Sequence, residues 1–107
     1  MRINWLLALP ILIAAPGIAE AEKYGDPVRG QIYAKETCSE CHGLTSADLL
    51  SPVAEATHFV TLANTPGMTG TALAVWLQTP HPSMPNFVIE PKDRDDVIAY
   101  IVSLKSD

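Results

Sequence analysis

Cys38-Ser39-Glu40-Cys41-His42 is the stretch of the chain that decides its fold. The two cysteines are three positions apart, and on a helical turn this spacing places both sulfurs on one face. They are the only cysteines among the 107 residues. A structural zinc site would need four nitrogen or sulfur ligands, and a thioredoxin-like redox site would follow a βαβ pattern. The chain has neither a second cysteine pair nor strand-like alternation before the motif.

The same pentapeptide has the pattern C-x-x-C-H, the attachment sequence for c-type haem. Its two thiols add to two vinyl groups of the porphyrin, so they must lie a short and fixed distance apart. The imidazole that follows can then approach the iron as the proximal ligand. The sequence therefore predicts one covalent haem c, with Cys38 and Cys41 as thioether positions and His42 bound to iron.

Residues 1–21 have the pattern of a secretory signal peptide. Arg2 is the only charge before a long apolar run, which is shorter than the roughly 20 residues of a membrane-spanning helix. Cleavage after Ala19 or Ala21 would leave one domain over 22–107 with no membrane span. Without cleavage, the same segment would anchor the domain at a membrane.

The predicted domain is small and acidic. The chain carries 12 Asp and Glu against 7 Lys and Arg, a net charge of −5. Binding to nucleic acid would need a basic stripe, which this sequence lacks. A domain of this size has a thin hydrophobic core and usually depends on a disulfide, a metal or a cofactor. Covalent haem would supply that apolar body.

The first and last helices are the clearest elements of the pattern. Residues 26–36 begin with an Asp-Pro pair, which suits an N-cap and the first helical position, and Val28 and Ile32 share one face. Gly30 costs about 1 kcal/mol relative to alanine within a helix, which suggests close helix packing there. The last helix, from Pro91 to about Lys105, carries a core-facing stripe of Val97, Tyr100, Ile101 and Leu104.

Two short helices are expected between them. Thr57 can cap the first, which carries Phe59, Leu62 and Ala63 and ends at Asn64. Thr69 or Thr71 can begin the second, with Leu73, Trp76 and Leu77 on a common face. Three prolines then stiffen the segment 79–86. These elements predict an all-α domain.

The sixth iron ligand is expected from this stiff segment. Met84 lies between Ser83 and Pro85, where little entropy is lost when a weak thioether–iron bond forms. Methionine ligation is typical where a higher reduction potential is wanted. Met68, His58 and His81 remain alternatives, with His58 expected instead on the surface of its short helix.

The chain resembles the small class I (cytochrome c-like) monohaem cytochromes of bacteria over nearly its whole mature length. The resemblance rests on five places: Gly30, Tyr33, the segment Cys38 to Gly43, Met84-Pro85 and Ala99-Tyr100. It implies about four short helices wrapped around one covalent haem. The N- and C-terminal helices would cross with Gly30 against Tyr100, and His42 and Met84 would bind iron on opposite sides.

The resemblance also implies two further contacts in the haem pocket. Pro52 would offer its carbonyl to the His42 imidazole N–H, although it also fits an ordinary loop proline. Trp76 would lie near a haem propionate, although a tryptophan at helical spacing also fits a core position.

The function implied by this family is periplasmic electron transfer between redox partner proteins, such as a membrane cytochrome complex, a dehydrogenase or an oxidase. The lysine-rich face by which some relatives dock on acidic partners is missing. We therefore expect partners with a basic or neutral docking patch, or docking steered mainly by apolar contact around the haem edge. The alternatives are a haem-based sensor with a labile or open sixth site, a peroxidase-like enzyme, and a thiol-disulfide exchanger. A protein that carries one electron at a time, rather than an enzyme, fits the motif and the methionine loop best.

Overall fold

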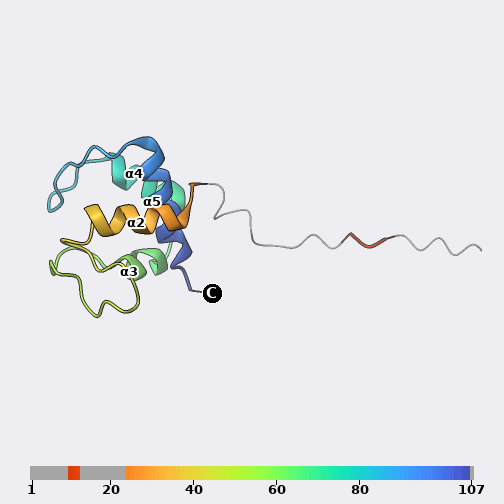
Figure 1. The fold of residues 1–107 in the computed structure, drawn as a ribbon, viewed down its shortest axis with the longest axis horizontal. Coiled ribbons are helices and arrows are strands. Elements are labelled where there is room, and N and C mark those ends of the chain that lie inside the picture. The colour runs from red at the N-terminus through yellow and green to blue at the C-terminus, as the bar shows by residue number, and fades with distance from the viewer. Residues whose placement is uncertain (1–9, 13–23, 107) are drawn as a thin grey trace, which may run out of the picture.

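The computed structural model describes residues 10–12 and 24–106, which include nearly all of the predicted domain. This part of the chain contains four named helices: α2 (Pro27–Thr37), α3 (Phe59–Asn64), α4 (Gly70–Gln78) and α5 (Pro91–Ser103) (Figure 1). The all-α fold is confirmed. None of the described helices is long and apolar enough to cross a bilayer. The predicted signal peptide lies outside the described residues, except for 10–12.

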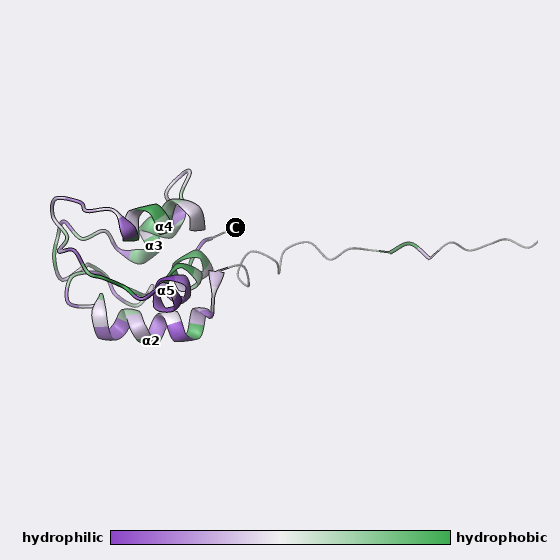
Figure 2. Ribbon diagram, turned by 90° about the horizontal axis from the view of Figure 1, so that it is seen from above, coloured by the Kyte–Doolittle hydropathy of each residue, from purple (hydrophilic) through white to green (hydrophobic). Residues whose placement is uncertain are grey.

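The N-terminal and C-terminal helices of the domain cross in close contact. Figure 2 shows α2 beneath α5, which is seen almost along its axis. Gly30 is buried at the crossing. A Cβ atom added there would lie 2.9 Å from Cβ of Tyr100, and closer still to the backbone carbonyl of Asp96. The predicted contact between Gly30 and Tyr100 is therefore present, and it explains why a costly glycine stands inside a helix.

The apolar face expected for α2 is not the face that packs. Val28 and Ile32 are 65% and 55% exposed, whereas Gly30 and Ala34 are buried. The crossing favours small side chains because the backbones of α2 and α5 approach each other directly. The helix is therefore buried along its small residues, and its larger β-branched residues face outward.

The helix caps explain where the elements begin. The carboxylate of Asp26 accepts hydrogen bonds from the backbone of Val28 and Arg29 at 2.8 and 3.3 Å, as expected of an N-cap. Thr69 caps α4 in the same way. The expectation for α3 was wrong, because His58 rather than Thr57 is its N-cap: the ring Nδ1 accepts a hydrogen bond from the backbone of Val60.

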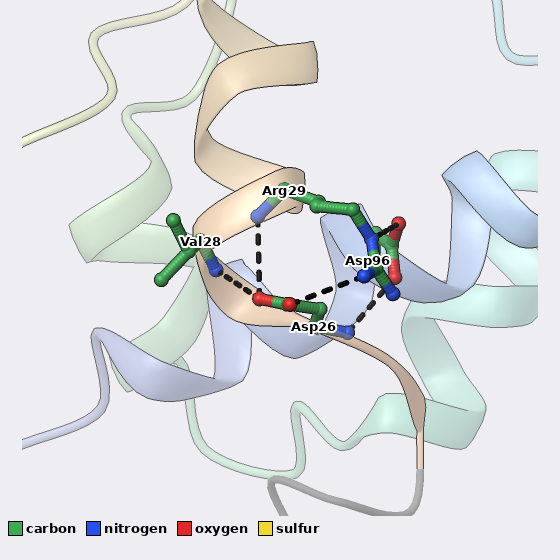
Figure 3. Close-up of polar contacts among 4 residues, drawn as sticks. All are labelled: Asp26, Val28, Arg29 and Asp96. Atoms are coloured by element: carbon green, nitrogen blue, oxygen red, sulfur yellow. Dashed lines mark hydrogen bonds and ion pairs between the residues drawn. The ribbon is translucent and has the colours of Figure 1, made fainter.

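A buried carboxylate joins α2 to α5 (Figure 3). Asp96 is 3% exposed, and it accepts hydrogen bonds from the backbone N–H of Asp26 at 2.8 Å and from Nε of Arg29 at 3.1 Å. Burial alone would raise the pKa of Asp96. The two hydrogen bonds and the charge of Arg29 outweigh burial, so the pKa is lowered. The carboxylate stays charged and ties the start of α2 to α5.

The core lies along α5, as the stripe in its sequence predicts. Val97, Ile98 and Ile101 are almost fully buried, and they pack with buried residues of the other helices: Ala34, Phe59, Ala63 and Leu73. Tyr100 is also buried, and its hydroxyl donates a 2.8 Å hydrogen bond to the carbonyl of Leu44. Helix α5 thus supplies the centre of the core, and through Tyr100 it also fixes the loop that follows the C-x-x-C-H motif.

Candidate functional site

The C-x-x-C-H motif forms a tight turn at the end of α2. Cys38 is the C-cap and donates its backbone N–H to Ala34 at 2.8 Å. The carbonyl of Cys38 then accepts the backbone N–H groups of Cys41 and His42, at 3.2 and 2.9 Å. Helix α2 therefore carries the motif directly, so its close packing on α5 also fixes the position of the three predicted haem-binding side chains.

Both cysteines are half-buried and free, although only two residues separate them. Burial, together with the neighbouring Cys41, raises the pKa of the Cys38 thiol to about 11. At neutral pH the Cys38 sulfur therefore keeps its proton. A protonated, partly buried thiol is a weak nucleophile, so Cys38 is a poor attacking group for thiol-disulfide exchange.

The imidazole of His42 is held in one orientation. Its Nδ1 lies 2.6 Å from the carbonyl oxygen of Thr57. Since a carbonyl only accepts, Nδ1 carries the proton and donates it, which leaves the Nε2 lone pair to bind a metal. The ring of Phe59, which is buried, lies 5.2 Å from the His42 ring, centroid to centroid. This is the arrangement expected of an iron-ligating histidine whose second nitrogen is oriented by the protein.

The loop that carries Met84 lies at the same end of the molecule as the motif. Figures 1 and 2 both place the loop between α4 and α5 beside the C-terminal end of α2. Met84 is half-buried, and its backbone N–H donates to the carbonyl of His81 at 3.3 Å. Its Sδ lies 3.0 Å from Nε2 of His81. The His81 ring is nearly perpendicular to that of Trp76, with the ring centroids 5.2 Å apart.

A comparison with known proteins identifies the family. A family model described as cytochrome c matches residues 28–105. The chain belongs to the cytochrome c family. It is also similar to a cytochrome c-552 from Bradyrhizobium diazoefficiens, with 28% identity over 100 residues that cover 94% of this chain and 95% of the relative. No solved structure gives a significant match.

The side chains of this cytochrome fit the cofactor of its family. Two free thiols three positions apart match the two thioether bonds of haem c, and His42 presents the Nε2 lone pair that iron requires. One covalent haem c with its iron is therefore the cofactor, and haem-based electron transfer is the activity of the family.

The candidates for the sixth ligand lie in different parts of the described structure. Met84 and His81 lie together in the loop beside the motif. Met68 instead lines a cavity of about 170 Å³ together with Tyr24 and Lys105. His58 is half-buried at the N-cap of α3 rather than fully exposed, and both of its ring nitrogens form hydrogen bonds within the fold.

One finer expectation for the pocket differs from the structure, and the surroundings of Trp76 exclude one of its two interpretations. The carbonyl that accepts the His42 N–H belongs to Thr57, not to Pro52. Val53 donates its backbone N–H to Cys41 at 3.1 Å, so the chain at Pro52 runs beside the motif backbone before it reaches the ring. Pro52 still lines a cavity of about 400 Å³ together with His42. Trp76 is not a core residue, because it is 53% exposed.

Sequence reasoning assigned no contact within the site to Thr57 or Gly43. Thr57 acts through its backbone carbonyl, which any residue type would supply, so its side chain gives no signal. Gly43 directly follows the motif, and the ring of His58 occupies the space where a Cβ atom would lie. A glycine at that position was the only signal for this contact.

Proposed function

We propose that this cytochrome is a periplasmic carrier of single electrons whose iron is held between His42 and Met84. The observation that carries the proposal is the hydrogen bond from Nδ1 of His42 to Thr57, because it orients the imidazole with Nε2 free for iron. The position of the Met84 loop beside the motif supports the second ligand.

Each side chain of the site has a distinct part in this proposal. Cys38 and Cys41 hold the cofactor covalently, so it cannot dissociate between reactions. The haem supplies the one-electron couple. His42 and Met84 fill both axial positions, which keeps small molecules away from the metal and limits rearrangement on oxidation. Pro52 and Trp76 remain proposed contacts at the edge of the pocket.

The partners are redox proteins that meet this cytochrome in the periplasm: a membrane cytochrome complex, a dehydrogenase or an oxidase. Its net charge of −5 favours partners with a basic or neutral docking patch, since complementary charge mainly accelerates association. A carrier of this kind is not an enzyme, because electrons leave by tunnelling and no substrate site is required.

Carbon monoxide binding tests the proposed ligands. The reduced wild-type protein should bind carbon monoxide poorly at neutral pH, and Met84→Ala should bind it readily while keeping its haem. Met68→Ala is the matched control and should behave like the wild type. If the wild type itself binds carbon monoxide readily, the sixth site is labile or open, and the sensor function replaces the electron carrier.

Cell fractionation tests the location. The haem-bearing form should be released with the periplasm, and its first residue should be Glu20 or Glu22, which follow Ala19 and Ala21. A protein that stays in the membrane fraction with its N-terminus intact would contradict the proposal and favour an uncleaved anchor.

A further inference from the structure

His58 uses both of its ring nitrogens within the fold. Nδ1 accepts the backbone N–H of Val60 at 3.0 Å. Nε2 lies 3.0 Å from the carbonyl oxygen of Asp48 and donates its proton to it. The two contacts are satisfied together by a single neutral tautomer, with the proton on Nε2. The ring therefore links the start of α3 to the middle of the loop that follows the C-x-x-C-H motif.

The same ring packs directly on the residue after the proximal histidine. Gly43 is buried, and a Cβ atom added to it would lie 2.7 Å from Nε2 of His58. The backbone of Gly43 is itself held on both sides: its N–H donates to Ser51 Oγ at 3.0 Å, and its carbonyl accepts the N–H of Phe59 at 2.9 Å. Movement of the His58 ring toward the motif is therefore blocked.

The loop contacted by His58 is fixed by further hydrogen bonds. The carboxylate of Asp48 accepts the backbone N–H groups of Leu44 and Thr45 at 2.9 and 3.0 Å. These hydrogen bonds lower the pKa of Asp48, so the carboxylate remains charged and the turn stays closed. The Asp48 carbonyl, which accepts the hydrogen bond from His58, is thus part of a turn that is itself closed by hydrogen bonds.

We propose that His58 is a positioning residue for the proximal ligand His42. The carbonyl that accepts the His42 Nδ1–H, at 2.6 Å, belongs to Thr57 and forms the peptide group that leads into His58. By binding Asp48 on one side and Val60 on the other, the His58 side chain holds this peptide group in place. The inference rests on the proposed function, because it takes His42 as an iron ligand.

The position of the Thr57 carbonyl affects how strongly the His42 imidazole donates electron density to a bound metal. A well-aligned acceptor on Nδ1–H makes the imidazole more basic and a stronger ligand. A stronger donor favours oxidised iron, so this hydrogen bond lowers the reduction potential. When the Thr57 carbonyl is no longer held, we expect the potential to rise.

The simpler interpretation is that His58 only caps α3. His58→Ser separates the two roles, because serine is a good N-cap but is too short to reach the Asp48 carbonyl. His58→Asn should restore part of the wild-type reduction potential, since an amide can cap the helix and also present an N–H toward Asp48. If His58 positions His42, the His58→Ser variant should have a higher reduction potential than the wild type although its helix cap is kept. The increase should be smaller in His58→Asn.

Gly43→Ala approaches the same contact from the other side. Its new Cβ would displace the His58 ring without changing either histidine. We expect its reduction potential to shift in the same direction as that of His58→Ser. Thr69→Ala is the control, because it removes the N-cap of α4, outside the loop that holds His42. It should lower the melting temperature without moving the potential.

The experiment measures two properties of each haem-loaded variant: the reduction potential by redox titration, and the exchange of the His42 Nδ1 proton by NMR in the reduced state. We expect His58→Ser to show a higher potential, with a severalfold lower ratio of oxidised to reduced protein at fixed ambient potential, and faster proton exchange. A wild-type potential and a protected proton in both His58→Ser and Gly43→Ala would overturn the inference. A wild type that lacks histidine ligation would overturn the proposed function instead.

Discussion

Replacement of Gly30 by alanine tests the helix crossing on which the site is built. The added Cβ would lie 2.9 Å from Cβ of Tyr100, whereas an optimal carbon–carbon contact is about 3.5–4.0 Å. This contact alone requires the helices to separate by at least about 0.6–1.1 Å, which removes about a quarter to a half of each dispersion contact across the crossing. The Asp96 carbonyl is closer still, and backbone offers no alternative rotamer.

The free energy of this change follows from two opposing effects. Overpacking costs about 1–3 kcal/mol, and we expect the upper end because backbone atoms are involved. Alanine returns about 1 kcal/mol of helix propensity. The expected net loss is about 2 kcal/mol of unfolding free energy.

Guanidinium unfolding of the haem-loaded protein, followed by circular dichroism, measures this loss as a lower midpoint at unchanged slope. Val28→Ala is the matched control in the same helix, since Val28 is 65% exposed and should change stability by less than about 0.5 kcal/mol. A Gly30→Ala protein as stable as the wild type, or more stable, would refute the close crossing.

Three further predictions concern the polar contacts around α2 and α5. Asp26→Ala removes the N-cap of α2 and should cost about 1 kcal/mol in chemical unfolding. Tyr100→Phe leaves the carbonyl of Leu44 without its donor and should cost about 1–3 kcal/mol, measured in the same way. The pKa of Asp96 is lowered on folding, so its contribution is complete above the ordinary pKa of about 3.9 and is lost as the pH falls through the lower folded value. Unfolding free energies measured across that range should fall less steeply in Asp96→Asn, and an unchanged slope would contradict the assignment.

The sequence predicted best where one physical requirement dominates. Val97, Tyr100 and Ile101 of the predicted stripe are buried, as expected of a core-facing helix. Burial extends over all six residues from Asp96 to Ile101, so α5 is covered on more than the predicted face, and Leu104 is only half-buried. Asp26 and Thr69 cap their helices because short oxygen-bearing side chains satisfy free backbone N–H groups. The haem motif was predictable because covalent attachment demands its residues in that order.

The remaining features depend on contacts between distant residues. Val28 and Ile32 of α2 face outward because α5 packs closely against the other side of the helix, where only small residues fit. The acceptor for His42 is a backbone carbonyl, so only the path of the loop shows that it belongs to Thr57. His58 became a helix cap because its Nδ1 reaches the N–H of Val60, a role that its residue type does not indicate.

The optical spectrum of the purified, oxidised protein tests the central claim most directly. Methionine–iron ligation gives ferric haem a weak long-wavelength absorption band, which we expect in the wild type and in Met68→Ala but not in Met84→Ala. A haem-loaded wild type without this band would contradict ligation by Met84, and a band that persists in Met84→Ala would assign the thioether to another methionine.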